Sequence, residues 1–340
     1  MLPFDAPLDA YVKEAAGLQT ASTNEDEARL AVARRYDFLD WPHLVEYVKA
    51  VSDPQSPVYR FERAVEAVID GDLTTLTRLL TADPALVRAR STRVTHFDPP
   101  VHGAQLLHYI AANGVEGYRQ RSPSNAADVA RLLLESGADP NALCKLYGGE
   151  CTTLALLVSS TPPAKAGVQV AVLDVLIDHG ASMAPAGEGH WTAPLETALV
   201  FNKHDAARRL VERGAPVDTL AAAAGLGRLD DVKRMLSLAT PGDRHRALAL
   251  AAQCGHSRVV ELLLDAGEDP NRYNPPGTHA HSTPLHQAIA AGQFDVVKLL
   301  VGRGARIDIT DTIYQGTPLA WADYCRQPEI AEYLRGASAT

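Results

Sequence analysis

Residues 283–308 read TPLHQAIAAGQFDVVKLLVGRGARID, and this stretch contains two short helical patterns in succession. Its apolar residues recur at steps of three and four, which is the period of an α-helix. They are Leu285, Ala288 and Ile289 in the first pattern, and Phe294, Val296, Val297, Leu299 and Leu300 in the second. Pro284 suits a first helical turn, because its missing N–H would have no partner within the helix. Gly292 separates the two patterns, and Gly304 is predicted to end the second helix.

The whole stretch resembles the ankyrin repeat, a helix-turn-helix unit of about 33 residues with a TPLHxA signature. The resemblance rests on TPLHQA at 283–288, Ala291-Gly292, VVKLL at 296–300, Gly304-Ala305 and Asp308. It implies an all-α solenoid, in which each unit buries its apolar face against its neighbours and an open concave surface remains. It also implies that His286, and His108 at the same position of another unit, are structural residues bonded to the backbone of the adjoining turn.

Further units follow the same register along the chain. The positions equivalent to His286 are Val65, His108, Ala155, Glu196, Ala221, Ala249 and Ala320. This count predicts about eight repeats over residues 58–338. Residues 1–57 do not match, and they are interpreted as an N-terminal helical hairpin with a linker. They resemble the hairpin that precedes ankyrin repeats in many bacterial proteins, and they would cap the first repeat or form a separate recognition element.

Composition and charge narrow the possible partners. The chain has 340 residues, 46% of them hydrophobic and 6% aromatic, and its formal net charge is −9. With no basic run, nucleic acid and anionic membrane surfaces are not expected as partners. The sequence has no apolar stretch long enough to cross a membrane and no secretory signal pattern. Its four cysteines form no C-x-x-C motif, so we expect a reduced, cytoplasmic protein. We also expect it to be a monomer.

Two repeats depart from the regular length. Extra residues fall at 115–125 in repeat two and at 159–167 in repeat three, and residues 86–104 form a long connection. These are either tolerated surface insertions or ledges of a binding surface. RARSTR at 88–93 is interpreted as a solvated loop. The joints after Gly214 and Ala239 are too short for the β-hairpin finger that usually links ankyrin repeats, so we predict an interrupted row of fingers.

The first functional hypothesis is a protein-interaction module that binds a partner through its concave face and fingers. Aromatic residues lie in or beside the predicted fingers, and tyrosine and tryptophan are enriched in interface hot spots. The predicted partner-binding residues are Tyr147, Glu150, His190, Trp191, Arg272, Tyr273, His281, Asp311, Tyr314 and Trp321. The identity of the partner protein is not encoded in any recognisable motif.

The second hypothesis is an enzyme or small-molecule binder, with a site formed by the additions in repeats one to three. Its candidate residues are His96, His102, Tyr118, Arg119 and Arg121. No nucleophile elbow, phosphate-binding loop or zinc-protease motif occurs in the sequence, and no cofactor is expected. His279 and His281 have a spacing that suits a metal, but no nearby cysteine or carboxylate completes a site. Cys144 and Cys151 would approach each other across a hairpin, where we expect reduced thiols.

Overall fold

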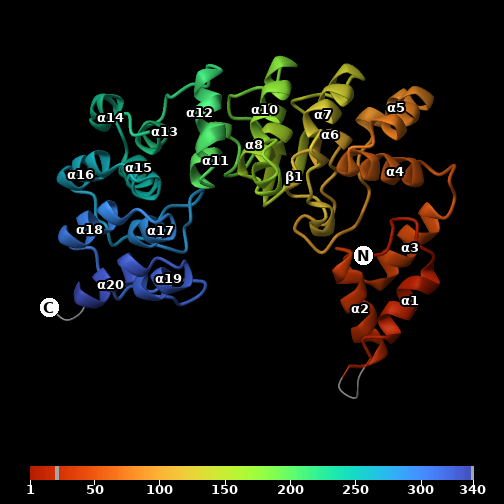
Figure 1. Cartoon of the computed structure of the whole chain (residues 1–340), viewed down its shortest axis with the longest axis horizontal. Helices are drawn as coiled ribbons and strands as arrows, with labels where there is room; N and C mark the ends of the chain where they lie inside the picture. Colours follow the sequence, from red (N-terminus) through yellow and green to blue (C-terminus); the bar gives the residue numbers. More distant parts are fainter. Residues whose placement is uncertain (20–22, 338–340) are drawn as a thin grey trace. The chain divides into compact units, whose positions relative to one another are not determined.

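The computed structural model describes residues 1–19 and 23–337, which form short helices and one β-hairpin (Figure 1). Contacts divide the chain into two compact units, Met1–Pro194 and Leu195–Thr340. We call them the first and second unit. In the described part of the chain, no helix is long and apolar enough to cross a membrane. This helical architecture agrees with the all-α solenoid predicted from the sequence.

The first unit begins with three helices around an aromatic core. They are α1 (Leu8–Ala16), α2 (Glu25–Arg35) and α3 (Trp41–Val51). Helix α2 starts with a capping box, in which the Asn24 side chain accepts the N–H of Glu27 and the Glu27 carboxylate accepts the N–H of Asn24. The rings of Tyr36 and Phe38 are buried between these helices. These contacts give residues 1–57 a core of their own.

Three helix pairs complete the first unit. They are α4 (Pro57–Asp70) with α5 (Leu73–Ala82), α6 (Leu106–Tyr109) with α7 (Ala126–Glu135), and α8 (Thr153–Ser159) with α10 (Gln169–Asp178). Helices α4, α6 and α8 pack in one row, and α5, α7 and α10 pack in a second (Figure 1). Three short elements lie in the connections: η1 (Pro84–Arg88), η2 (Gly117–Arg119) and α9 (Pro162–Lys165). Each pair therefore hides its apolar face against the next, as repeat architectures require.

A β-hairpin links α7 to α8. It consists of β1 (Leu143–Leu146) and β2 (Gly149–Thr152), and its turn residues Tyr147 and Gly148 both have positive φ, as tight hairpin turns require. Cys144 and Cys151 are direct partners in its register and are free thiols. Burial raises the pKa of Cys151 to about 11 and raises that of Cys144 further, so both thiols are protonated at neutral pH.

Five helix pairs form the second unit. They are α11 (Pro194–Val200) with α12 (His204–Glu212), α13 (Leu220–Gly225) with α14 (Leu229–Leu236), α15 (Pro241–Cys254) with α16 (Ser257–Asp265), α17 (Pro284–Ala290) with α18 (Phe294–Gly302), and α19 (Pro318–Tyr324) with α20 (Pro328–Ala337). Helices α13, α15, α17 and α19 form one row, and α14, α16, α18 and α20 form a parallel row (Figure 1). Leu285, Ile289, Val297 and Leu300, which were expected from the period, are fully buried between the rows.

The connections in the second unit are uneven, as the register predicts. Residues 213–219 join α12 to α13, and residues 237–240 join α14 to α15. Helix α15 has 14 residues, whereas the equivalent helix α17 has 7. The additional turns at the start of α15, from Pro241, occupy the place of a finger. Within the described residues, strands pair as a hairpin at 143–152 alone. The connections at 271–282 and 309–317 were expected to be β-hairpin fingers, and that expectation is wrong, because they are built from turns.

Gly304 has φ +88°, in the left-handed region that non-glycine residues rarely adopt. Replacing it with valine should lower the free energy of unfolding of the second unit by about 1–2 kcal/mol. Gly302 is a matched control, because a Cβ meets no atom within 4 Å at either position and Gly302 lies inside α18. Gly302→Val should change the same quantity by about 0.5 kcal/mol or less. Equal urea midpoints for the two variants would contradict the assigned backbone strain.

Candidate functional site

A buried carboxylate organises the turn that follows α18. One oxygen of Asp311, Oδ1, accepts the backbone N–H groups of Ile313 at 3.0 Å and Tyr314 at 2.6 Å. The other oxygen, Oδ2, accepts the N–H of Gly316 at 2.8 Å and the indole Nε1–H of Trp321 at 2.9 Å. Burial alone would raise the pKa of Asp311, but these hydrogen bonds together lower it to about 2. Asp311 was predicted to touch a partner; it is fully buried and instead shapes the turn.

Trp321 is the centre of an aromatic cluster on α19. The ring of His281 lies 5.9 Å from the indole and 6.2 Å from the Tyr314 ring, measured between centroids. The ring of His286 packs on the indole at 5.1 Å. Nε2 of His286 donates to the carbonyl of Gly316 at 3.3 Å, which agrees with the structural role implied by the ankyrin signature. The indole is thus held from two sides.

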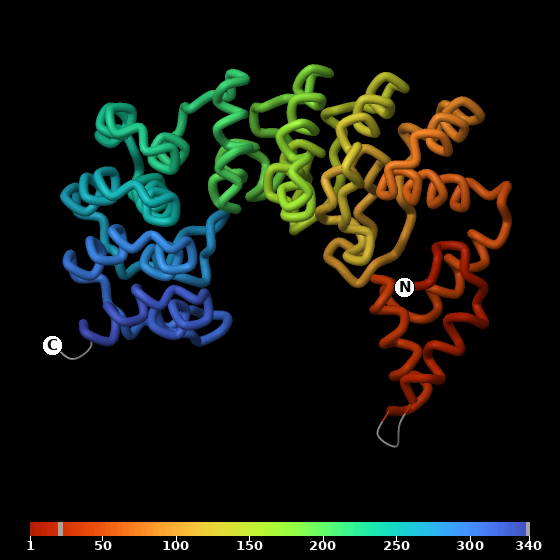
Figure 2. Tube along the Cα trace, in the orientation of Figure 1, coloured from red at the N-terminus to blue at the C-terminus, as the bar shows by residue number. Residues whose placement is uncertain are grey.

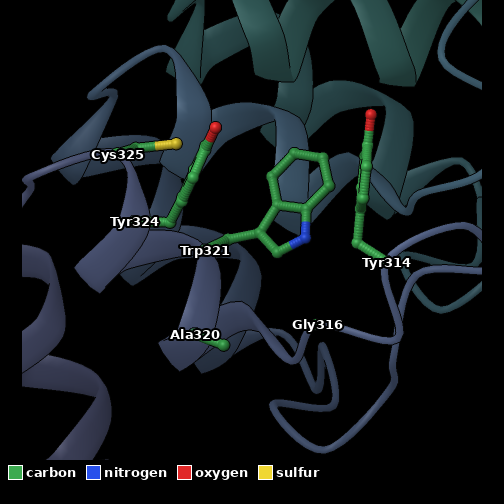
Figure 3. A pocket seen from close by; sticks show the side chains of 6 residues that line it. All are labelled: Tyr314, Gly316, Ala320, Trp321, Tyr324 and Cys325. Atoms are coloured by element: carbon green, nitrogen blue, oxygen red, sulfur yellow. The ribbon is translucent and has the colours of Figure 1, made fainter. Parts of the chain in front are cut away.

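A cavity of about 430 Å³ opens beside this cluster. It is lined by Tyr314, Gly316, Ala320, Trp321, Tyr324 and Cys325. Figure 3 shows Tyr314 and Tyr324 on opposite sides of the Trp321 indole, with both hydroxyls at the same end. Tyr314 is 75% exposed and Tyr324 is 89% exposed, so both rings are free to contact another molecule. Sequence reasoning missed Tyr324, although its spacing of three from Trp321 places both on one helix face.

Two neighbouring loops carry the other predicted residues of the second unit. The Tyr273 hydroxyl donates to the carbonyl of Thr310 at 2.7 Å, and the N–H of Thr312 donates to the carbonyl of His281 at 2.8 Å. Arg272 is exposed beside Tyr273. The structure therefore brings together Arg272, Tyr273, His281, Asp311, Tyr314 and Trp321 on the loops 271–282 and 309–317 and on α19.

The remaining four predicted residues belong to the first unit. Tyr147 and Glu150 lie on the β1–β2 hairpin, and His190 and Trp191 lie on the loop before α11. The N–H of Glu150 donates to the carbonyl of Glu188 at 2.7 Å, so the hairpin and this loop are in contact. Tyr147 is 54% exposed while its hydroxyl donates to Asn113 Oδ1 at 2.6 Å.

The additions to repeats one and two are packed inside the first unit. Arg93, Glu116 and Arg119 are buried together with Glu62 of α4. Nη2 of Arg119 lies 2.5 Å from Glu62 Oε2, and Nε of Arg93 lies 3.5 Å from Glu116 Oε1. The interpretations of 88–93 as a solvated loop and of 115–125 as a surface insertion or ledge are therefore wrong for these residues. Figure 2 traces the connection at 86–104 from the orange helices toward the red N-terminal segment, where Thr95 pairs with Phe38.

The residues proposed for a catalytic site in this region are paired with other side chains of the first unit. His102 is buried with Nε2 3.2 Å from Glu116 Oε1, whereas Arg121 is at the surface, 2.7 Å from Asp70. The guanidinium of Arg93 lies over the rings of Phe38 and Tyr47, at 4.2 and 4.5 Å from their centroids. Burial would raise the pKa of Glu116, but Arg93, His102 and Arg119 hold it well below its usual range.

His96 and Tyr118 also lie at contacts within the first unit. His96 is exposed, with Nδ1 4.0 Å from Asp37 Oδ1, and the Tyr118 hydroxyl accepts from Arg93 Nη1 at 2.6 Å. In the second unit, His279 Nε2 donates to the carbonyl of Val200 at 3.1 Å. Among the residues that the structure describes, no group of three or more His, Cys, Asp or Glu side chains is arranged to hold a metal ion.

The comparisons with known proteins agree with the helix pairs. The family model described as ankyrin repeats (3 copies) matches residues 219–311 and 248–340. The chain is 32% identical to cyclin-dependent kinase inhibitor 2A of Homo sapiens over 125 residues, which are 36% of this chain and 78% of that protein. It is 33% identical to human cyclin-dependent kinase 4 inhibitor B over 129 residues, 37% of this chain and 91% of that protein. The chain belongs to the ankyrin repeat family.

A longer alignment joins the chain to a much larger protein. It is 28% identical over 229 residues to the ankyrin repeat and KH domain-containing protein mask-1 of Caenorhabditis elegans. That alignment covers 65% of this chain but only 8% of the length of mask-1. It therefore extends the likeness over more repeats without relating this chain to the rest of mask-1.

Proposed function

We propose that this chain binds a partner protein through the loops 271–282 and 309–317 and the exposed face of α19. We call this the finger surface. The observation that carries the proposal is the group of exposed aromatic residues at this surface, above all Tyr314 and Tyr324. Large exposed aromatic rings contribute most of the binding energy in many protein interfaces. The kinase inhibitors similar to this chain are named for action on another protein, which supports the same class of function.

The finger surface is held in shape before any partner arrives. Asp311 fixes the turn through four hydrogen bonds, and Tyr273 ties one loop to the other through Thr310. A preformed surface loses less conformational entropy on binding than a flexible one, so more of its contact energy appears as affinity. The rigid loops would therefore contact a partner protein through side chains whose positions are already fixed.

The finer features of the proposal rest on the sequence register and on the family. We count eight ankyrin repeats over residues 58–338 and assign residues 1–57 as an N-terminal cap. Tyr147, Glu150, His190 and Trp191 would form a further contact region in the first unit. We propose a monomer of bacterial origin that acts in the cytoplasm, with neither nucleic acid nor a membrane as its partner.

The double variant Tyr273→Ala, Tyr314→Ala should lose capture of the partner while its far-UV circular dichroism stays unchanged. The immobilised chain would be incubated with extract of its native cytoplasm, and retained proteins would be quantified by mass spectrometry. Leu238→Ala is the matched control, because Leu238 is 89% exposed but lies outside the finger surface. If the double variant retains the same proteins as the parent chain, the finger surface is not the binding site.

A further inference from the structure

The cavity beside Trp321, which we call the slot, is lined mainly by aromatic rings. Tyr314, Trp321 and Tyr324 contribute aromatic rings, and Figure 3 shows the two tyrosine rings standing on either side of the indole. Among the described residues that line it, none carries a formal charge. Aromatic faces carry partial negative charge, and a cation within about 6 Å of such a face is attracted to it.

The buried carboxylate of Asp311 lies next to the residues that line the cavity. The Asp311 carboxylate contacts three of the lining residues: the N–H groups of Tyr314 and Gly316 and the indole Nε1–H of Trp321. Accepting the indole N–H fixes the orientation of the ring, and the adjacent negative charge makes its π-system more electron-rich. Because the Asp311 carboxylate is fully buried, a ligand in the cavity would contact the aromatic rings and not the carboxylate. The negative charge would still attract a cationic ligand electrostatically across the rings.

The other charged residues near the slot do not line it. Asp323 follows Ala322 on α19 and is paired with Arg335 of α20 at 2.7 Å. Arg326 is exposed just after α19 and is absent from the lining of the cavity. The charged group that is hydrogen-bonded to the lining residues themselves is the Asp311 carboxylate, which favours a cationic occupant over a carboxylate or phosphate.

We propose that this slot holds the alkylammonium group of a lysine side chain, free or N-methylated, presented by the partner protein. This inference rests on the proposed function, and it specifies that the partner segment carries a lysine or methylated lysine side chain. The methylated form suits the slot best, because methyl groups lower the cost of removing water from the cation while the positive charge remains. A proline-rich or purely aliphatic segment would also fit apolar walls, but it would gain nothing from Asp311.

The test compares peptides that differ only in the charge of one side chain. Three short Gly-Ser peptides would carry lysine, trimethyl-lysine, or the neutral isostere in which carbon replaces the quaternary nitrogen. Each would be titrated into the full chain in a Trp41→Phe, Trp191→Phe background, so that Trp321 reports binding by fluorescence. We expect the trimethyl-lysine peptide to bind on the order of tenfold more tightly than its neutral isostere. Equal affinities, or no binding up to about 10 mM, would overturn the proposal.

Variants then assign the preference to the slot. Tyr324→Leu should abolish the preference for the cation, and Tyr324→Phe should keep it, since the ring and not the hydroxyl provides the attraction. Asp311→Asn should reduce the preference severalfold, with a thermal melt to establish that the second unit is still folded. Tyr147→Leu, an exposed tyrosine outside the slot, is the control and should leave the preference unchanged. A preference that survives Tyr324→Leu, or tighter binding of a proline-rich peptide, would contradict the assignment.

The two proposals fail in different ways. If the Tyr273→Ala, Tyr314→Ala variant loses its partner but the slot binds both isosteres equally, the finger surface stands and the cation slot is wrong. If the charged peptide is preferred and partner capture nevertheless survives the double variant, the slot stands and the proposed interface is wrong.

Discussion

Replacing Arg119 with methionine should lower the free energy of unfolding of the first unit by about 3–5 kcal/mol. The guanidinium of Arg119 is fully buried and lies 2.5 Å from Glu62 and 3.7 Å from Glu116. Methionine fills much of the same volume but leaves both buried carboxylates without this partner. A buried charge that loses its counter-charge keeps the full cost of its removal from water, and this cost dominates the effect.

The loss would be measured by urea unfolding, with the fluorescence of Trp41 on α3 as the probe in a Trp191→Phe, Trp321→Phe background. Arg131→Met is the control, because the Arg131–Asp128 pair is exposed on both sides. Its removal should change the free energy of unfolding by less than about 1 kcal/mol. Adding Glu62→Gln to Arg119→Met should restore part of the stability, since one of the buried carboxylates that lost Arg119 is then neutral. Similar unfolding midpoints for Arg119→Met and Arg131→Met would show that the buried network does not stabilise the unit.

Lowering the pH from 6.5 to 4 should remove up to about 3 kcal/mol of stability through His108 alone. His108 is fully buried; its Nδ1 accepts the N–H of Gln105 at 3.0 Å, and its Nε2 donates to the carbonyl of Ala142 at 3.1 Å. Burial lowers its pKa to about 4. Between this value and the ordinary pKa of 6.5, the unfolded chain binds a proton that the folded chain does not. The contribution is therefore complete above pH 6.5 and is lost as the pH falls toward 4.

Urea unfolding of the first unit at a series of pH values across this window measures the effect. His108→Gln serves as the reference, because glutamine keeps a donor and an acceptor but does not titrate. The parent chain should lose more stability than the variant on acidification, and the difference should grow steadily as the pH approaches 4. Parallel pH profiles would mean that His108 is protonated equally in the folded and unfolded chain.

The helix pairs could be predicted because their signals are local. In 283–308, the apolar period and the position of Gly304 together predict α17 and α18, and φ of +88° at Gly304 explains why glycine stands there. The role of His286 followed from the same signature. Each of these features depends on residues within one repeat, so a single stretch of sequence is sufficient to reveal it.

The buried ion network could not be predicted, because its members meet only in the folded chain. Arg119 is separated by 57 positions from its partner Glu62, and nothing in the sequence around 115–125 distinguishes a buried arginine from a solvated one. The same reason explains the wrong interpretation of Arg93, whose guanidinium packs against Phe38 of the N-terminal segment. Charged residues that pair over a long sequence separation produce no repeating pattern in the local sequence, so they cannot be recognised from it.

The candidate site was predicted in part. Tyr314 and Trp321 do lie together, because the loop that carries Tyr314 leads directly into α19, which carries Trp321. Asp311 was expected at the surface because it is a charged residue in a turn, whereas its hydrogen bonds to the turn bury it. Tyr324 was not predicted, because it lies at the end of α19, away from the connections in which aromatic residues were taken as a signal of binding.

The early start of α15 determines where this protein can be given new specificity. Turns such as those at 271–282 and 309–317 accept inserted or exchanged residues, because a lengthened loop adds little entropic cost. A helix has a fixed number of residues per turn, so an insertion within α15 would rotate the side chains on one side of it out of the core. Libraries of altered binding variants should therefore vary the two loops and leave 237–254 untouched.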